Sequence, residues 1–183
     1  MKQARRPIRH SSRRICLGSG AANPRLSHRV IRQVMDDPLV KVKADIEQFG
    51  WHCLHVYPRV GEDGIGFTYT IGLFASYGHP EIIIFGLSKE TSHAILNDCA
   101  EAIKGGARYA VGEPISNVVG GNVRVYFRPV LANQFSIFGT ASRYYGAVPF
   151  TAVVLFWPDK QGLFPWEPSS QCASSQAEGL SVV

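Results

Sequence analysis

The sequence lacks a long apolar run, because none of its hydrophobic stretches approaches the roughly 18 residues that a membrane-spanning helix requires. It also lacks, at its start, the charged-then-apolar pattern of a secretory signal. These two absences argue against the membrane and secreted classes of protein. They predict a cytoplasmic protein that has no membrane partner.

Cysteine is scarce and dispersed, and no C-x-x-C pair or dense framework occurs among Cys16, Cys53, Cys99 and Cys172. The pattern therefore gives no sign of a disulfide scaffold. Cys53 lies between His52 and His55, which are neighbours that could activate a thiol. Adjacent residues of a strand point to opposite faces, so we do not predict a catalytic role for Cys53.

Acidic residues are absent from residues 1–35, although this stretch carries nine of the 19 basic residues. The remainder holds ten basic and all 14 acidic residues, a formal charge of −4. Residues 1–35 are rich in Arg, Ser, Gly and Pro and have no hydrophobic periodicity, which predicts a disordered basic arm. Such an arm is typical of nucleic-acid binding or of an import peptide. Nucleic acid is predicted as a partner only if residues 1–34 are present.

Methionine is also scarce, with Met1 and Met35 as its only two positions. Met35 stands immediately before the first helix signal. We therefore hypothesise that translation starts at Met35 and that the basic arm reflects the assignment of the gene start. An intact mass that includes the arm, measured on protein made from the native gene, would contradict this hypothesis.

Residues 36–168 are predicted to form one domain, because 45% of the chain is hydrophobic and 18% is charged, which are globular proportions. The Ser-rich residues 169–183 are predicted to be a flexible tail. Asp37 and Pro38 open an amphipathic helix that ends at Gly50. Ser88 opens a second helix, which ends at Gly105. Residues 133–145 are a third helical candidate.

Strands are predicted in "WHCLHVY" (51–57), "GFTYTIGL" (66–73), "PEIIIFGL" (80–87), "NVRVYFRPV" (122–130) and "VPFTAVVLFWPD" (148–159), which are rich in β-branched and aromatic residues. The intervening "FASYGH" (74–79) is predicted to be a short turn. Too few helices separate the strands for a doubly wound parallel sheet. The pattern predicts a single α+β domain, with a mainly antiparallel sheet packed by two or three helices.

The segments "GFTYTIGL", "HPEIIIFGL", "HAILNDCAEAIKGG" and "LFWPDKQGLFPWEP", in this order, resemble the bacterial family catalogued as domain of unknown function 4262. The similarity runs from about Asp45 to Pro168. The resemblance supports the predicted domain boundaries. It implies no activity and no catalytic residues, because none is established for the family.

The triplet His79-Pro80-Glu81 is the strongest chemical candidate in the sequence. Proline favours extended geometry in the residue before it, so His79 and Glu81 can share one face, where a carboxylate could orient an imidazole. The alternative is that both side chains satisfy backbone groups at the start of a strand. Asp159, at the end of a buried strand, is added as a polar candidate above a pocket.

Six further residues are candidates for binding: Tyr69, Arg124, Tyr126, Arg128, Trp157 and Trp166. They combine aromatic faces with guanidinium groups, which suit anions or stacked rings, but they also fit a solvated sheet face and a core lid. His52 and His55 have the spacing of a metal pair, yet an odd spacing in a strand sends them to opposite faces. No metal site is therefore predicted for this pair, and a three-ligand site that also draws on His79 stays an open alternative.

The sequence leads to three functional hypotheses. The first is a ligand- or partner-binding or regulatory module, with a pocket beside His79 and Glu81 and an unknown protein or small molecule as its partner. The alternative is a small hydrolase in which His79 is the base and Glu81 orients it, with or without a divalent metal. The third is a flavin-binding barrel, suggested by the many strands and by the apolar runs that end in glycine. The sequence does not identify a cofactor.

Overall fold

The computed structural model describes residues 37–59, 61, 63–120 and 123–183. The predicted basic arm, the hypothesis of a start at Met35 and the nucleic-acid partner that depends on the arm all lie outside these residues. Among the residues described, no helix combines the length and the apolar character needed to cross a membrane.

The centre of the fold is one open six-stranded sheet, with the strand order β1-β2-β3-β6-β5-β4. Its strands are β1 (His52–Val56), β2 (Phe67–Ile71), β3 (Glu81–Phe85), β4 (Pro114–Val119), β5 (Val123–Pro129) and β6 (Ala152–Phe156). Only the β3–β6 pair is parallel; the other four pairs are antiparallel. The predicted α+β class with a mainly antiparallel sheet is confirmed. The barrel architecture of the flavin-binding hypothesis is wrong, because the described strands form one open sheet with a linear order.

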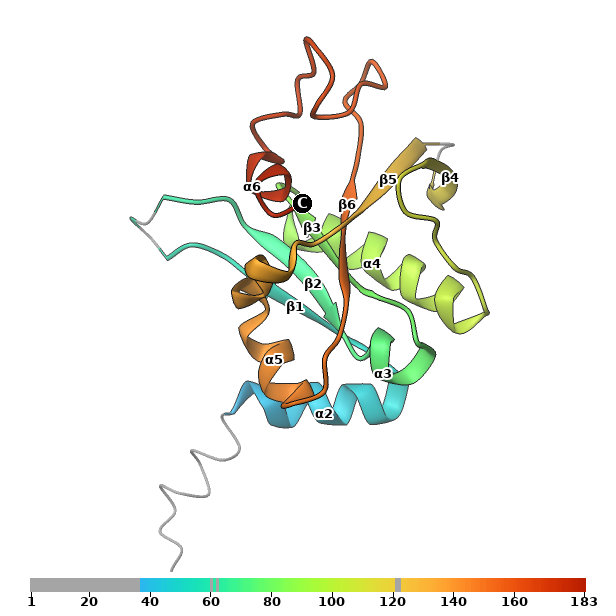
Figure 1. Ribbon diagram of the computed structural model, residues 1–183, viewed down its shortest axis with the longest axis vertical. Coiled ribbons are helices and arrows are strands. Elements are labelled where there is room, and N and C mark those ends of the chain that lie inside the picture. The colour runs from blue at the N-terminus through green and yellow to red at the C-terminus, as the bar shows by residue number, and fades with distance from the viewer. Residues whose placement is uncertain (1–36, 60, 62, 121–122) are drawn as a thin grey trace, which may run out of the picture.

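Helices cover both faces of this sheet (Figure 1). They are α2 (Pro38–Phe49), α3 (Leu73–Tyr77), α4 (Lys89–Lys104), α5 (Gly139–Tyr145) and α6 (Ala177–Ser181), with a 3-10 helix, η1 (Ala132–Phe138), before α5. The two predicted caps are confirmed. The Asp37 carboxylate accepts from the Leu39 N–H at 3.0 Å, and the Ser88 hydroxyl accepts from the Thr91 N–H at 3.2 Å.

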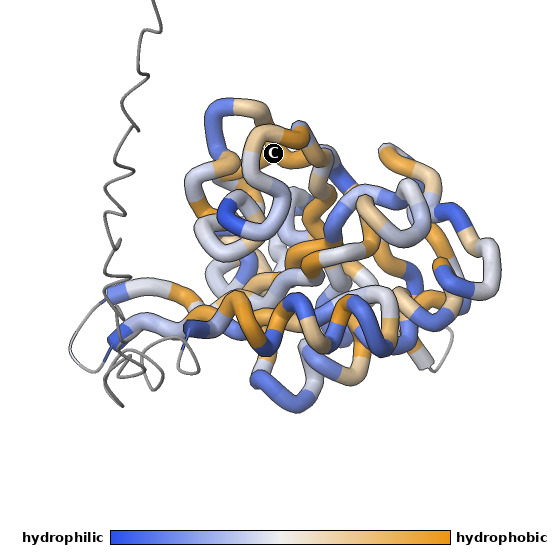
Figure 2. Tube along the Cα trace, turned by 90° about the horizontal axis from the view of Figure 1, so that it is seen from below, coloured by the Kyte–Doolittle hydropathy of each residue, from blue (hydrophilic) through white to orange (hydrophobic). Residues whose placement is uncertain are grey.

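The hydrophobic core is divided between the two faces. On one face, α2, α5 and the C-terminal segment pack on Tyr69, Ile83 and Phe156. On the other face, α4 packs on Ile82, Val125 and other residues of the strands. The central strands β3 and β6 are buried along their whole length. In Figure 2, hydrophobic and hydrophilic residues alternate along the helices, as expected for elements with one face against the sheet.

Three segments differ from the sequence-based expectation. The predicted turn "FASYGH" contains the short helix α3. Strand β4 was not predicted, because half of its residues are exposed and its register is shifted around Asn117, which has φ +66°. The third helical candidate forms η1 and then α5, and the change from 3-10 to α geometry occurs at Gly139.

The segment from residue 169 to residue 183, predicted to be a flexible tail, lies against the sheet in the structure. Cys172, Gln176 and Val182 are buried, and the Gln176 amide exchanges two hydrogen bonds with the backbone of Trp157. The composition of the segment gave no sign of this, because the burial rests on a few isolated side chains.

Candidate functional site

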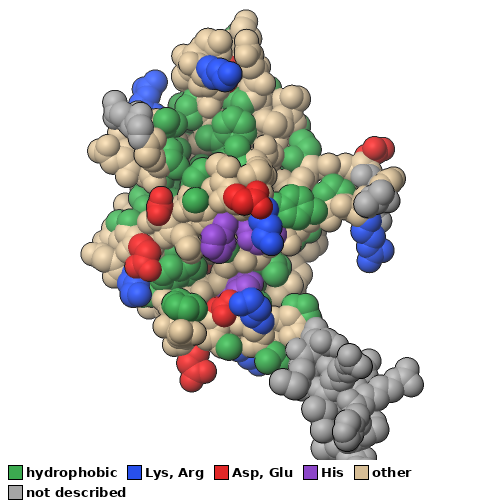
Figure 3. Space-filling model, turned by 180° about the vertical axis from the view of Figure 1, so that it is seen from behind, with side chains coloured by type: hydrophobic (Ala, Val, Ile, Leu, Met, Phe, Trp, Pro, Cys, Tyr) green, Lys and Arg blue, Asp and Glu red, His purple; other side chains and the backbone are tan. Residues whose placement is uncertain are grey.

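A pocket of about 860 Å³ opens between α2, β1 and α4, and we call it the β1 groove. Its lining residues come from all three elements and the segments next to them: Pro38, Lys41, Asp45, Phe49, Trp51, His52, Cys53, Leu54, His55, Lys89, Glu90, His93, Asn97 and Glu101. Figure 3 shows histidine side chains gathered on this face of the molecule, with acidic and basic side chains beside them. The groove therefore combines apolar walls with a concentrated set of polar groups.

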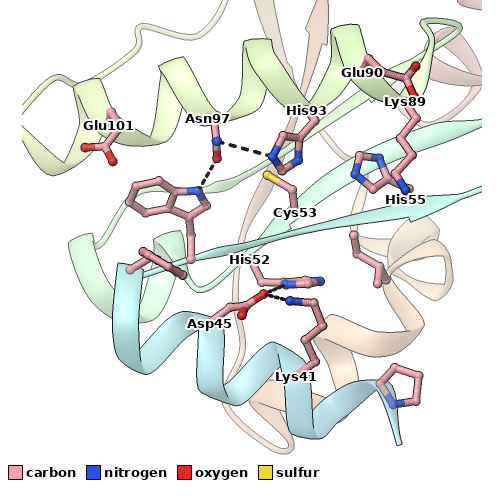
Figure 4. A pocket seen from close by; sticks show the side chains of 14 residues that line it. Lys41, Asp45, His52, Cys53, His55, Lys89, Glu90, His93, Asn97 and Glu101 are labelled. Carbon is pink, nitrogen blue, oxygen red and sulfur yellow. Dashed lines mark hydrogen bonds and ion pairs between the residues drawn. The ribbon is translucent and has the colours of Figure 1, made fainter. Parts of the chain in front are cut away.

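The groove follows the free edge of the sheet. β1 is the first strand in the sheet order, and among the described strands it pairs with β2 alone. Figure 4 shows α2 on one side of β1 and α4 on the other. His52 lies on the side of α2, whereas His55 lies beside His93 of α4. Because the groove wraps around the strand edge, it collects side chains from both faces of the sheet.

On the α2 side, an aspartate orients a histidine. Asp45 Oδ2 lies 2.7 Å from His52 Nδ1 and 2.8 Å from Lys41 Nζ. Burial disfavours the Asp45 carboxylate, but the hydrogen bonds from Lys41 and His52 outweigh it and lower the pKa of this group. Among the described residues, no hydrogen bond engages His52 Nε2. This nitrogen is therefore available to a ligand.

On the α4 side, a chain of hydrogen bonds fixes a second histidine. The Trp51 indole N–H donates to Asn97 Oδ1 at 3.0 Å. This contact turns the Asn97 amide nitrogen toward His93 Nε2, 3.5 Å away, which accepts from it. The Asn97 amide thus lies beside the ring of His93, which is exposed at the groove.

A third histidine stands beside the second. The His55 and His93 rings are 5.6 Å apart between centroids, and His55 Nδ1 lies 2.9 Å from Thr68 Oγ1. Burial, followed by the charges of Lys89, His93 and His52, lowers the pKa of His55, and Glu90 opposes this only in part. Burial is therefore the main factor that favours the neutral form of the His55 imidazole.

The groove does not have the features of a thiol enzyme or a metal centre. Burial raises the pKa of the Cys53 thiol to about 12, so a thiolate is strongly disfavoured at neutral pH. Within the described part of the chain, no group of three or more His, Cys, Asp or Glu side chains has an arrangement that could hold a metal ion.

His79 and Glu81, the sequence candidates, lie outside the groove and on opposite faces of the sheet. His79 is buried, donates from Nδ1 to the Pro80 carbonyl at 2.7 Å and packs edge-on against Tyr109. Its Nε2 is buried and has no hydrogen-bond partner among the described residues. Burial lowers the pKa of His79, the Pro80 carbonyl opposes this, and the charge of Arg108 adds to it.

Glu81 is fully buried and organises the turn before α3. Its Oε1 accepts from the N–H groups of Gly72 at 2.9 Å and Phe74 at 3.1 Å, and from the Tyr145 hydroxyl. Its Oε2 accepts from the Thr70 hydroxyl at 2.6 Å. Burial raises the pKa of Glu81, and these hydrogen bonds offset it only in part. The contacts describe an internal anchor for α3.

Asp159 is half-buried and holds a loop together. Its two carboxylate oxygens accept from the N–H groups of Gln161, Leu163 and Gln171 at 2.9 to 3.0 Å. The hydrogen bond from Gln171 is the main cause that lowers the pKa of Asp159. No hydrogen bond or ion pair joins Asp159 to His79 or Glu81, all three of which belong to the described part.

Three of the six binding candidates meet on one face. The Arg128 guanidinium lies 3.7 Å from the centroid of the Trp166 ring and 5.5 Å from that of Tyr126. Trp166 is also stacked on Phe164, with ring centroids 5.0 Å apart. Arg124 is exposed and has no contact of this kind among the described residues. The face of the Arg128 guanidinium that a ligand could stack on is thus already occupied by the aromatic rings of this cluster.

The other two binding candidates are structural in their contacts. Tyr69 is 1% exposed and packs edge-on against Phe138. The Trp157 indole N–H donates to the Phe85 carbonyl at 3.3 Å. None of the six candidates lines the groove. Of the residues that do, His52, Cys53 and His55 were considered in the sequence. No sequence signal joins them into one site, because their meeting depends on the position of their strand at the sheet edge.

Comparison with known proteins identifies one family. The family model described as "Domain of unknown function (DUF4262)" matches residues 45–171. No curated protein and no solved structure matches the chain.

Proposed function

The chain belongs to the DUF4262 family of domains of unknown function, and we propose that it is a binding module whose ligand occupies the β1 groove. The observation that carries the proposal is the convergence of three histidines on one open, largely apolar pocket. Pockets of several hundred Å³ with apolar walls and a few placed polar groups are typical ligand sites. The first sequence hypothesis, a binding module, is kept, but its site moves from His79 to the groove.

The polar groups of the groove are positioned before any ligand arrives. Asp45 orients His52 at 2.7 Å, and the Trp51 indole holds Asn97, which makes a longer contact of 3.5 Å with the exposed His93. A side chain that is already held in place loses little conformational entropy on binding, which improves affinity. This arrangement supports recognition of a defined ligand.

A direct test is an NMR titration of the full-length protein that follows the ring signals of His52, His55 and His93. The probes are a library of small polar fragments and a pool of random heptapeptides. We expect hits that shift these three rings together. Shifts confined to other parts of the protein, or no shift with either probe class, would contradict the proposal.

A pair of variants on one helix provides the control. His93→Trp fills the groove and is expected to abolish the ring shifts of His52 and His55. Ala94→Trp places the same bulk at the next position, which is exposed and does not line the groove. Equal loss of binding in the two variants would argue against the groove as the site.

The Asp45–His52 pair favours a second candidate function, hydrolysis of the bound ligand. A carboxylate that holds Nδ1 of an imidazole leaves Nε2 able to take a proton from water. Turnover of a chromogenic ester or phosphate panel that is lost in His52→Gln would support it, and recovery of every bound probe unchanged would contradict it. The hydrolase hypothesis that uses His79, Glu81 and Asp159 stays a prediction. None of these three residues lines the groove, so the proposed site gives it no support.

A further inference from the structure

We propose that the ligand of the β1 groove is an extended polypeptide segment, which adds to the free edge of β1 as a further strand and places an acidic side chain beside His55 and His93. This inference rests on the proposed function and names the class of its ligand. Addition of a strand to an exposed sheet edge is a general mode of peptide recognition, in which main-chain hydrogen bonds supply affinity and side-chain pockets supply specificity.

The first argument is the direction of the backbone groups in β1. The Gly86 N–H donates to the Gly66 carbonyl at 3.1 Å, at the end of the β2–β3 pair. In an antiparallel pair, every second residue directs its backbone N–H and C=O groups to the partner strand, so those of Thr68 in β2 also point to β3. The backbone groups of the residues on either side, Phe67 and Tyr69, therefore point to β1.

The alternation continues across β1. Tyr69 pairs with Leu54 and Phe67 with Val56, in an unbroken register. The backbone groups of Leu54 and Val56 thus bond to β2, whereas the N–H and C=O groups of Cys53 and His55 point away from the sheet. No hydrogen bond to these outward groups is found among the described residues. They offer two donors and two acceptors at the spacing of a strand.

The second argument is the shape of the groove, which admits one strand and not another sheet. α2 and α4 stand on the two sides of β1 (Figure 4). A single added strand would lie about 4.8 Å from β1 and would bring no helices that have to fit between α2 and α4. A second copy that approached by its own β1 would bring its α2 and α4 to the same place. The geometry therefore favours an isolated extended segment.

The third argument is a lysine on the α4 wall. Lys89 lines the groove beside His55 (Figure 4), and no ion pair with Lys89 is found among the described residues. Of the two carboxylates on the same wall, Glu90 is adjacent to Lys89 in the sequence, and Glu101 lies 4.0 Å from Lys104. In the α2 wall, by contrast, Lys41 is already paired with Asp45. An added strand turns alternate side chains to the two walls, so an acidic side chain is best placed where it faces α4.

The test uses heptapeptides selected on the full-length protein from a displayed random library. Each selected peptide is then remade with one backbone nitrogen methylated at a time, because a methylated amide cannot donate. We expect affinity to fall about tenfold or more at every second position and to change little at the positions between. Equal effects at all positions would overturn strand addition, while shifts of the histidine rings would still support the groove as the site.

Amide exchange gives the complementary measurement and separates the other occupants of the edge. We expect the Cys53 and His55 amides to exchange fast in the free protein, and about tenfold or more slowly in the peptide complex. Protection of both amides in a free monomer would assign the edge to another segment of this chain. Protection in a free dimer would assign it to a second copy. Either result overturns the proposal, and so does a selected peptide whose Glu→Gln or Asp→Asn variant binds unchanged.

Discussion

Substitutions of Glu81 test how far its buried hydrogen bonds and its charge contribute to the stability of the protein. The contacts of Glu81 allow two substitutions, to Ala and to Gln, to be compared. Glu81→Ala removes the acceptor for the Gly72 and Phe74 N–H groups and for the hydroxyls of Thr70 and Tyr145. The Gly72 N–H retains a second acceptor, since Tyr145 Oη lies 3.2 Å from it. The Phe74 N–H is left without one among the described residues.

Glu81→Gln keeps most of the same contacts without a charge. Its Oε1 can accept from Gly72, Phe74 and Tyr145, and its Nε2 can donate to Thr70 Oγ1. The comparison of Ala with Gln therefore isolates the lost hydrogen bonds and the cavity. One orphaned buried N–H costs about 1–3 kcal/mol, and the two hydroxyls and the cavity add to it, so we expect Ala to be about 3–5 kcal/mol less stable than Gln.

The pH dependence separates the charge from the hydrogen bonds. Burial raises the pKa of Glu81 above its ordinary value of 4.5, so the folded protein holds this proton more tightly than the unfolded chain. Between 4.5 and the higher native pKa the folded state binds more protons, and stability therefore falls as the pH rises through this window. We expect Glu81→Gln to lack this fall.

Urea unfolding of the three proteins, repeated from pH 4.5 to pH 8, measures both effects. His79 contributes in the opposite direction, because its pKa is lowered and its contribution to stability is lost as the pH falls below its ordinary value of 6.5. This contribution cancels when wild type is compared with Glu81→Gln. Equal stability of the Ala and Gln variants, or parallel pH profiles of wild type and Gln, would refute the reasoning.

Two further predictions concern the Asp159 loop and the Cys53 thiol. Asp159→Ala should accelerate amide exchange of the loop residues whose N–H groups it accepts, Gln161 and Leu163 among them, while exchange in β3 stays unchanged. Cys53 should resist iodoacetamide at pH 8 in the folded protein and react after unfolding, since its pKa of about 12 leaves little thiolate; peptide mapping of rapid native alkylation at Cys53 would contradict this.

The sequence predicted those elements whose signals are local. Helices α2 and α4 begin at side-chain caps, Asp37 and Ser88, and α2 ends at Gly50, which adopts φ +98°. The five predicted strands are all present, because their apolar or alternating patterns extend over five residues or more. Local signals of this kind need no knowledge of the neighbouring elements.

The elements that were missed depend on contacts between distant residues. α3 has only five residues and no side-chain cap of its own; its first N–H groups are satisfied by Glu81, which follows it in the sequence. Gly72, just before α3, has φ +112°, and an added Cβ would lie 2.9 Å from the Gly50 carbonyl oxygen. The need for glycine there follows from the packing of α2 and cannot be read from "YTIGL" alone.

The candidate site was missed for a reason that concerns strand order. The expectation that His52 and His55 point to opposite faces follows from strand geometry, and the structure places them on opposite sides of β1. In a central strand this separation would put a sheet between the two rings. At an edge the two faces meet in one groove, so the rings can serve one ligand. A sequence gives the alternation of a strand but not its place in the sheet, and here the place decides whether the histidines form a site.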